Sequence, residues 1–381
     1  VRRGGSWFND GTNLRSAERS SHPPGSRAYD LGFRVGFQAV KPDGANPELE
    51  LFGGAGVTRE AGQAWAEPGV EAHDARDGNI TDQIVVTGSV DMNSTGTYLL
   101  TYSVQDAAGN PATATRTVTV TGNRTVDLNA TVAMDMIWCP PGTFTMGSPT
   151  TEADRQADRE DEHNVSLTKG FYLGKYEVTQ AQYEAVMTGN TDSLSVTPSQ
   201  WPNNPNRPVE NVSWDDIQIF LTRLNAQQSA NIPAGWAYVL PTESQWEYAC
   251  RAGCRAGYPS AIKDLGKHGN FADRTLYDDR ELVHYVYACR EADDGYGRVF
   301  APVGQYLPNP WGIHDMLGNL AELCSTYYLD KLTAGTDPNF QSLPAPRGSR
   351  HRVSRGGSWC SPPEYLHAAF RNAFTGTQTP H

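Results

Sequence analysis

One five-residue segment occurs twice in the chain, as Arg3–Trp7 and again as Arg355–Trp359, and both copies read RGGSW. The same spacing relates Leu14 to Leu366. Repetition of this kind indicates an array of related modules rather than one continuous domain. We therefore expect residues 1–37 to be the C-terminal tail of a truncated module, and the chain to be cut from a longer array.

Composition narrows the class of protein. The 381 residues include 37 Gly and 25 Pro, and 38% of them are hydrophobic. This balance excludes a disordered chain and predicts a loop-rich fold with few long helices. The formal net charge of −12 argues against nucleic acid as a partner, and it suits acidic loops that bind hard cations. No run of 18 apolar residues is present, so we expect no membrane span in this stretch.

Residues 47–122 have the pattern of a small β-sandwich. Short strands are predicted at 48–51, 84–86, 97–104 and 115–120, and the last two alternate apolar and polar residues. Turn clusters such as Asp77-Gly78-Asn79 and Asp106–Asn110 separate them. The stretch resembles bacterial Ig-like surface modules, which implies an all-β Ig-like sandwich serving as an extracellular spacer or adhesion unit.

From Met134 onward the chain is rich in Trp, Gly and Pro. Three helices are predicted at about 179–187, 213–225 and 242–252, and each range begins with a Thr or Ser suited to cap the first turn. Long loops between such short elements need disulfides or metal ions to hold them. The six cysteines allow one or two disulfides or a set of free, buried thiols.

Six motifs follow one another in this second region. They are Gly142–Ser148 (GTFTMGS), Gly174–Thr179 (GKYEVT), Pro208–Trp214 (PVENVSW), Leu240–Ala249 (LPTESQWEYA), Asn309–Glu322 (NPWGIHDMLGNLAE) and Arg355–Trp359. In this order they resemble the formylglycine-generating enzyme, or sulfatase-modifying factor, family over residues 134–381, with the tail of a second copy at 1–35. The resemblance implies an α+β domain with an irregular C-type-lectin-like fold.

Calcium is the first cofactor that the resemblance implies. Ca²⁺ takes six to eight oxygen ligands, and Asp315 and Glu322 flank a glycine turn that offers such oxygens. The family ligands map onto the side chains of Asp315, Glu322 and Glu177 and the carbonyls of Gly318 and Leu320. A second, weaker calcium site maps onto the side chains of Asn270 and Asp294 and the carbonyls of Phe271 and Tyr296. The alternative is that these acids only cap turns.

The catalytic positions depart from the family pattern. Family oxidases convert a substrate cysteine to formylglycine with O₂ and copper, and two cysteines in a C-x₄-C arrangement hold the copper. Ser361 and Leu366 stand at those positions, and Cys360 is displaced by one residue, which in an extended segment turns it to the opposite face. We therefore expect no copper and no confident catalytic residue. Cys360 is either paired with Cys324, reactive, or structural.

The leading hypothesis is an extracytoplasmic modular protein whose calcium-stabilised domain is a binding or accessory module with a degenerate oxidase site. One alternative is an active formylglycine-generating oxidase acting on a sulfatase cysteine. Another is a lectin-like surface protein, with a protein or glycan ligand at the cell surface or with other copies of the module as partners. A further hypothesis is that Gly32–Arg34 completes the 134–381 domain by strand complementation; the alternative is that residues 1–37 are only a remnant.

Overall fold

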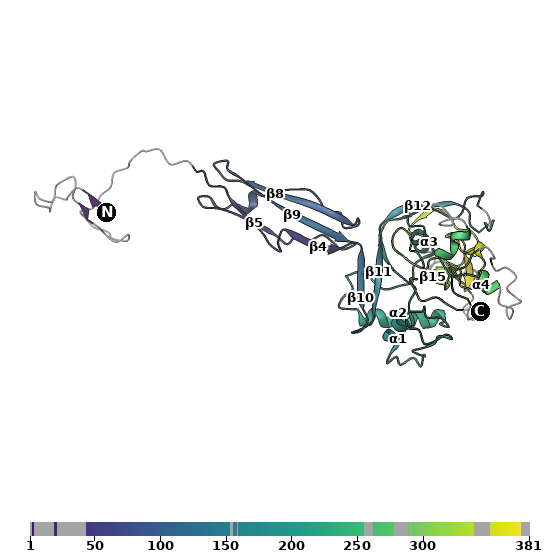
Figure 1. The fold of residues 1–381 in the computed structure, drawn as a ribbon. Helices are drawn as coiled ribbons and strands as arrows, with labels where there is room; N and C mark the ends of the chain where they lie inside the picture. Colours follow the sequence, from purple (N-terminus) through teal and green to yellow (C-terminus); the bar gives the residue numbers. More distant parts are fainter. Residues whose placement is uncertain are drawn as a thin grey trace, which may run out of the picture.

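A computed structural model of the chain describes two domains that follow one another (Figure 1). It describes residues 43–152, 155–157, 159–254, 262–277, 289, 292–297, 299–338 and 351–374, together with the paired strands β1 (Arg2–Arg3) and β2 (Arg19–Ser20). Apart from these two strands, the tail at 1–37 lies outside the described residues, and so does the expected strand complementation by Gly32–Arg34. Among the described helices, none combines the length and the apolar character that a membrane crossing requires.

The first domain is a sandwich of two sheets, as predicted. One sheet has the order β3 (Glu48–Leu51), β5 (Val70–Asp74), β6 (Gly78–Asn79), and the other has the order β4 (Gly56–Glu60), β9 (Pro111–Thr121), β8 (Gly96–Gln105), β7 (Val85–Thr87). A short 3₁₀ helix, η2 (Thr81–Gln83), leads into β7. Strand β4 runs parallel to β9, and the other pairs are antiparallel. The inward side chains of β8 and β9, among them Tyr102 and Val118, are fully buried, because alternate residues of each strand face the same side.

The second domain is α+β, as predicted, and it contains three small sheets in the described residues. They are β10 (Asn123–Asp127), β11 (Ala133–Cys139) and β14 (Phe171–Gly174); β12 (Gly142–Met146), β13 (His163–Leu167) and β16 (Gly335–Thr336); and β15 (Glu322–Tyr327), β17 (Arg352–Arg355) and β18 (Asn372–Phe374). The helices are α1 (Gln180–Met187), α2 (Trp214–Gln227), α3 (Glu243–Arg251) and α4 (Arg274–Tyr277), with 3₁₀ helices η3 (Ile262–Lys267) and η4 (Pro363–Tyr365). Long loops connect these short elements.

The first three helices begin where their capping residues predict. Thr179, Ser213 and Thr242 each accept the backbone N–H three residues further on, and the side chain of that third residue accepts the N–H of the capping residue in return. This reciprocal pair satisfies two of the four N–H groups that a helix start leaves unpaired. The sequence signal was reliable here because it is entirely local.

Two apolar clusters form the main core of the second domain. Tyr183 of α1 stacks on Phe220 of α2 with ring centroids 5.5 Å apart, over the β10–β11 hairpin. The other cluster surrounds Trp246 of α3 and includes Cys139 and Cys324. None of the six cysteines forms a disulfide, so the pairings considered from the sequence, including Cys324 with Cys360, are not made. Apolar packing holds these loops where disulfides were one expectation.

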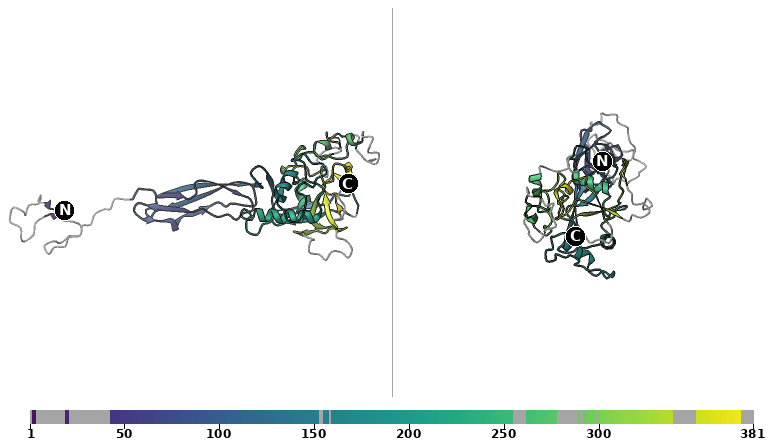
Figure 2. Two further views of the ribbon diagram at one scale, coloured as in Figure 1. Left: turned by 90° about the horizontal axis from the view of Figure 1, so that it is seen from below. Right: turned by 90° about the vertical axis from the view of Figure 1, so that its right-hand side faces the viewer.

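The two domains meet through β11. Its Trp138 is buried in the apolar core of the sandwich, and its backbone N–H donates to the carbonyl of Gly122, the single residue between β9 and β10. The Trp138 indole N–H donates to the carbonyl of Asn93 at 2.9 Å, and the Tyr172 hydroxyl donates to the carbonyl of Ala61 at 2.9 Å. The sandwich therefore continues directly into the second domain as an elongated arm (Figure 2).

Candidate functional site

A buried ion network surrounds helix α3. Glu243 and Glu247 lie one helical turn apart and face Arg355, whose Nη2 is 2.6 Å from Glu247 Oε2 and whose Nε is 3.1 Å from Glu243 Oε1. Arg371 binds both oxygens of Glu243 at 2.6 and 2.8 Å, and Arg251 Nε donates to Glu247 Oε1 at 2.8 Å. These bonds fasten the β17 end and the chain around residue 371 to one helix.

The network is structural in character. Burial by itself would raise the pKa of Glu247, but the guanidinium groups of Arg355 and Arg251 outweigh it and hold that pKa below its usual range. The carboxylates of Glu243 and Glu247 in turn raise the pKa of Arg355. Glu247 and Arg355 are therefore both charged at neutral pH, which suits a structural anchor better than a proton donor or acceptor.

The predicted calcium loop, residues 315–322, is shaped by three left-handed residues. Asp315, Gly318 and Asn319 have φ angles of +59°, +82° and +57°. Gly318 donates its N–H to the carbonyl of Gly356, which ties the loop to the RGGSW segment. A Cβ on Gly318 would lie 2.0 Å from the carbonyl oxygen of Asn270, so only glycine allows this approach.

Glu177 reaches this loop from the segment between β14 and α1. Its Oε1 accepts the backbone N–H of Leu320 at 2.8 Å, and its Oε2 accepts the side-chain amide of Asn319 at 2.7 Å. Burial raises its pKa well above the usual range, and the negative charges of Asp315 and Glu322 raise it further. Three carboxylates thus repel one another in a buried place, which is the electrostatic setting that a cation relieves.

The other two carboxylates have one satisfied oxygen each. Asp315 Oδ2 accepts the N–H of Gly304 at 2.7 Å, whereas its Oδ1 is buried without a donor. Glu322 Oε2 accepts the indole N–H of Trp246 at 2.9 Å, and burial raises the pKa of Glu322 to about 7. Buried polar atoms without partners are rare in folded proteins, so the bare Asp315 oxygen fits a ligand position.

The residues of the second predicted site are linked by hydrogen bonds. Asp294 accepts the N–H of Phe271 at 2.8 Å and the N–H of Tyr296 at 2.7 Å, and burial raises its pKa to about 7. The neighbouring Asn270 donates to Asn319 Oδ1 at 3.3 Å, while its own Oδ1 is buried without a donor. Asn319 therefore bridges the two predicted sites, a role that the sequence analysis did not assign to it.

Neither predicted calcium site has three carboxylate oxygens gathered around one point. Within the described ranges, the only three acidic, His or Cys ligand atoms that lie within 4.8 Å of one another belong to Asp43, Asp74 and Asp106 in the first domain. A cation near Glu177 or Asp294 would therefore need backbone carbonyls and water for much of its coordination, which Ca²⁺ accepts.

The two copper positions lie side by side but carry no thiolate. A Cβ on Gly357 would be 3.2 Å from Leu366 Cδ1 and 3.4 Å from Ser361 Cβ, so both residues flank one turn. Leu366 is 0% exposed and packs against apolar neighbours such as Phe271. Cys360 contacts the hydroxyl of Ser358 at 3.3 Å, and burial raises the pKa of its thiol. Cu(I) prefers thiolate ligands, so these residues do not fit it.

A cavity of about 520 Å³ lies beside these positions. Its walls are mostly apolar and include Phe220 and Leu224 of α2. Towards the RGGSW segment it reaches Glu322, Ser361 and Cys360. The cavity therefore connects the helical core of the domain with the place where family oxidases hold their metal.

Two protein-family models match the chain, one for each of its two domains. The model of the sulfatase-modifying factor enzyme 1-like domain matches residues 123–381, and that of the bacterial surface protein Ig-like domain matches residues 49–120.

The chain is 25% identical over 297 residues to the formylglycine-generating enzyme of Thermomonospora curvata, covering 65% of this chain and 90% of that protein. It is 28% identical over 272 residues to the chaperone protein LppX of Paenibacillus barcinonensis, covering 61% and 81%. The structure of PvdO from Pseudomonas aeruginosa matches with a TM-score of 0.53 at 22% identity, covering 68% of this chain and 94% of that one, which shows a shared fold. The chain thus belongs to the sulfatase-modifying factor enzyme family, with a bacterial-surface Ig-like domain ahead of its family domain.

Proposed function

We propose that residues 134–381 form a calcium-stabilised binding or accessory module that lacks copper oxidase activity. The observation that carries the proposal is the pair Ser361 and Leu366, which flank one turn and offer no sulfur. A hydroxyl and a buried isobutyl group cannot replace two thiolates for a soft metal. The neighbouring Cys360 has a raised pKa and so little thiolate at neutral pH.

Calcium, unlike copper, fits the residues that are present. Asp315, Glu322 and Glu177 would hold one ion with the carbonyls of Gly318 and Leu320. The support is the buried, donor-free Oδ1 of Asp315 and the raised pKa values of the three carboxylates. The ion would neutralise their charge and hold the loop; it has no chemical step to perform.

The second ion would be held by Asn270 and Asp294 with the carbonyls of Phe271 and Tyr296. The support is the buried, donor-free Oδ1 of Asn270 and the raised pKa of Asp294. Because Asn319 contacts both sets, each ion would stabilise the loop that serves the other.

We also propose that this protein is extracytoplasmic, either secreted, periplasmic or at the cell surface. The support for this location is the match to a bacterial surface Ig-like domain. A relative named as a chaperone protein supports an accessory role rather than oxidation. The apolar cavity next to Ser361 favours a protein ligand with apolar side chains over a glycan, whose hydroxyls need polar partners.

The deciding experiment supplies Cu(I), O₂, a thiol reductant that keeps the copper reduced, and a peptide that carries the sulfatase cysteine motif. Mass spectrometry should find the peptide cysteine unchanged, and the protein should bind no stoichiometric Cu(I). The double variant Ser361→Cys with Leu366→Cys should gain Cu(I) binding, which shows that the assay detects a working pair of thiols. Aldehyde formation by the natural chain, lost in Cys360→Ser, would establish the oxidase alternative instead.

A further inference from the structure

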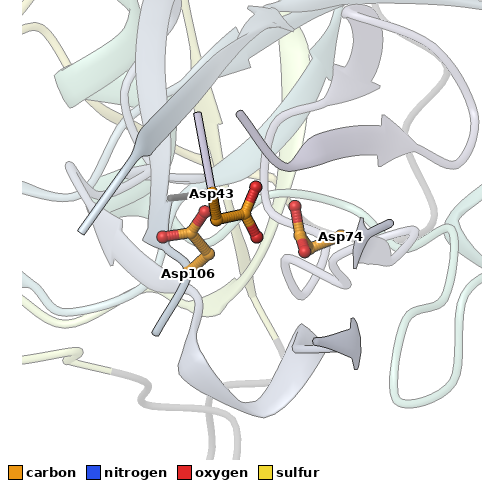
Figure 3. A group of neighbouring side chains, drawn as sticks. All are labelled: Asp43, Asp74 and Asp106. Carbon is orange, nitrogen blue, oxygen red and sulfur yellow. The ribbon is translucent and has the colours of Figure 1, made fainter. Parts of the chain in front are cut away.

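Three aspartates converge at the end of the Ig-like sandwich that lies far from the second domain (Figure 3). Asp43 precedes β3, Asp74 is the last residue of β5, and Asp106 follows β8. One carboxylate oxygen from each lies within 4.8 Å of the other two. The three residues come from distant parts of the sequence, and the sandwich topology brings them to one edge.

Two of the three carboxylates are more than nine-tenths buried. Asp74 is 6% exposed and Asp106 is 5% exposed, while Asp43 is half-buried. Within the described residues, no Lys, Arg or His forms an ion pair with any of them. Burying like charges side by side without a counter-charge is costly, and proteins resolve this by pairing the charges or by binding a metal ion.

The hydrogen bonds leave a specific set of oxygens bare. Asp74 Oδ1 accepts the N–H groups of Arg76 and Asp77 at 2.7 and 2.9 Å, but its Oδ2 is buried without a donor. Asp43 repeats the pattern, since Oδ1 accepts the N–H of Ala45 at 3.2 Å and Oδ2 is buried without a donor. The carboxylates of Asp43 and Asp74 are thus each held by their own turn through one oxygen, and the second oxygen of each is without a donor.

Asn110 completes the arrangement. Its backbone N–H donates to Asp106 Oδ1 at 2.8 Å, and its side-chain amide donates to Asp106 Oδ2 at 2.7 Å and to the carbonyl of Asp43 at 3.3 Å. These bonds orient Asp106 and tie the segment before β3 to the β8–β9 turn. The ligand positions are consequently set before any ion arrives.

We propose that Asp43, Asp74 and Asp106 bind a Ca²⁺ ion that fastens the segment entering the Ig-like domain to the end of the sandwich. An all-oxygen site built from carboxylates of three separate segments suits a hard cation, and Ca²⁺ tolerates such irregular geometry better than Mg²⁺ does. Soft metals are disfavoured because no sulfur or imidazole ligand is in the group. Water and nearby carbonyls would fill the remaining coordination positions.

The test uses the full chain after treatment with EDTA, with CaCl₂ as the probe. Hydrogen exchange with and without Ca²⁺ should show new protection in residues 43–47, 74–78 and 105–110. Calorimetric titration of Asp74→Asn should show one ion fewer per chain than the natural protein, and protection of these three segments should disappear. Asp82→Asn, which removes one negative charge from the exposed 3₁₀ helix η2, should leave both measurements unchanged.

Two outcomes overturn the site. One is the absence of Ca²⁺-dependent protection in those segments of the natural chain, which is independent of how any variant folds. The other is an equal number of bound ions in Asp74→Asn and in the natural protein. Glu322→Ala separates this site from the calcium sites proposed in the second domain, because that variant should retain all protection in residues 43–47 and 105–110.

Discussion

The indole N–H of Trp246 donates a 2.9 Å hydrogen bond to Glu322 Oε2, and it joins the middle of helix α3 to the end of the 315–322 loop. Trp246 is fully buried, so this bond positions the carboxylate from inside the core. The Glu322 carboxylate is therefore fixed at the end of the loop by a residue of the core.

Calcium should stabilise the second domain through this carboxylate. A ligand that binds only the folded state raises the free energy of unfolding by about 2.7 kcal/mol at a hundredfold excess over Kd. We expect the melting temperature to rise between EDTA and millimolar Ca²⁺, and Glu322→Ala to lose most of that rise. Glu184→Ala, an exposed carboxylate on α1, is the control and should respond like the natural chain. Equal responses in both variants would remove Glu322 from the site.

Without calcium, the stability of this domain should depend on pH. Burial raises the pKa of Glu322 from 4.5 to about 7, so the folded state favours the protonated form. Its contribution is fully present below pH 4.5 and is lost as the pH rises through 7. In EDTA the melting temperature should therefore fall between pH 5 and 8, and less so in Glu322→Gln. Identical slopes in the two proteins would contradict the assignment of this titration to Glu322.

Ca²⁺ affinity should change in the opposite sense over the same range. Binding requires ionised carboxylates, so the ion displaces protons from Glu322 and Asp294, whose pKa values are both about 7. Calorimetric titration at pH 6 and pH 8 should give tighter binding at the higher pH. Proton release should be visible as a buffer-dependent enthalpy at pH 6, and affinities independent of pH would argue for ligands other than these carboxylates.

Arg355→Met should destabilise the domain by roughly 3–5 kcal/mol, because it leaves Glu243 and Glu247 buried with too few positive partners. Urea denaturation measures this loss. Lys331→Met removes one exposed positive charge instead and should stay within about 0.5 kcal/mol of the natural protein. A small effect of Arg355→Met would mean that Arg251 and Arg371 suffice to balance the two glutamates.

Gly318→Ala and Gly312→Ala separate backbone strain from steric overlap. Both glycines have φ between +80° and +90°, but a Cβ on Gly312 meets open space. Gly312→Ala should cost about 1–2 kcal/mol from strain alone. Gly318→Ala should cost roughly 1–3 kcal/mol more, since the carbonyl of Asn270 must move. Equal unfolding free energies in the two variants would show that the loop can shift without penalty.

The sequence predicted those elements whose signals are local. The capping residues Thr179, Ser213 and Thr242 predicted three helix starts, because the hydrogen bonds that stop the chain from fraying lie within four residues. Alternation over 97–104 predicted strand β8 for the same reason. The order of the motifs predicted the family of the second domain, since six separate matches are hard to obtain by chance.

What the sequence did not predict depends on contacts between distant residues. Asp74 and Asp106 look like ordinary turn aspartates in the sequence, and only the pairing of the strands brings them together with Asp43. Nothing in the sequence indicated that Glu243 and Glu247 are buried and form ion pairs with Arg355. Asn319 likewise sits inside a recognised motif, but its contacts with both predicted calcium sites arise from folding.

The parallel pairing of β4 with β9 has a mechanical consequence. A pull between residue 43 and the second domain would enter β4 at Gly56 and leave β9 at Thr121, at opposite ends of the same five-residue ladder. Tension applied this way loads the rungs together in shear, whereas a pull at one end would unzip them in turn. Because Trp138 also anchors β11 in the sandwich, we expect the junction with the second domain to resist such tension as well.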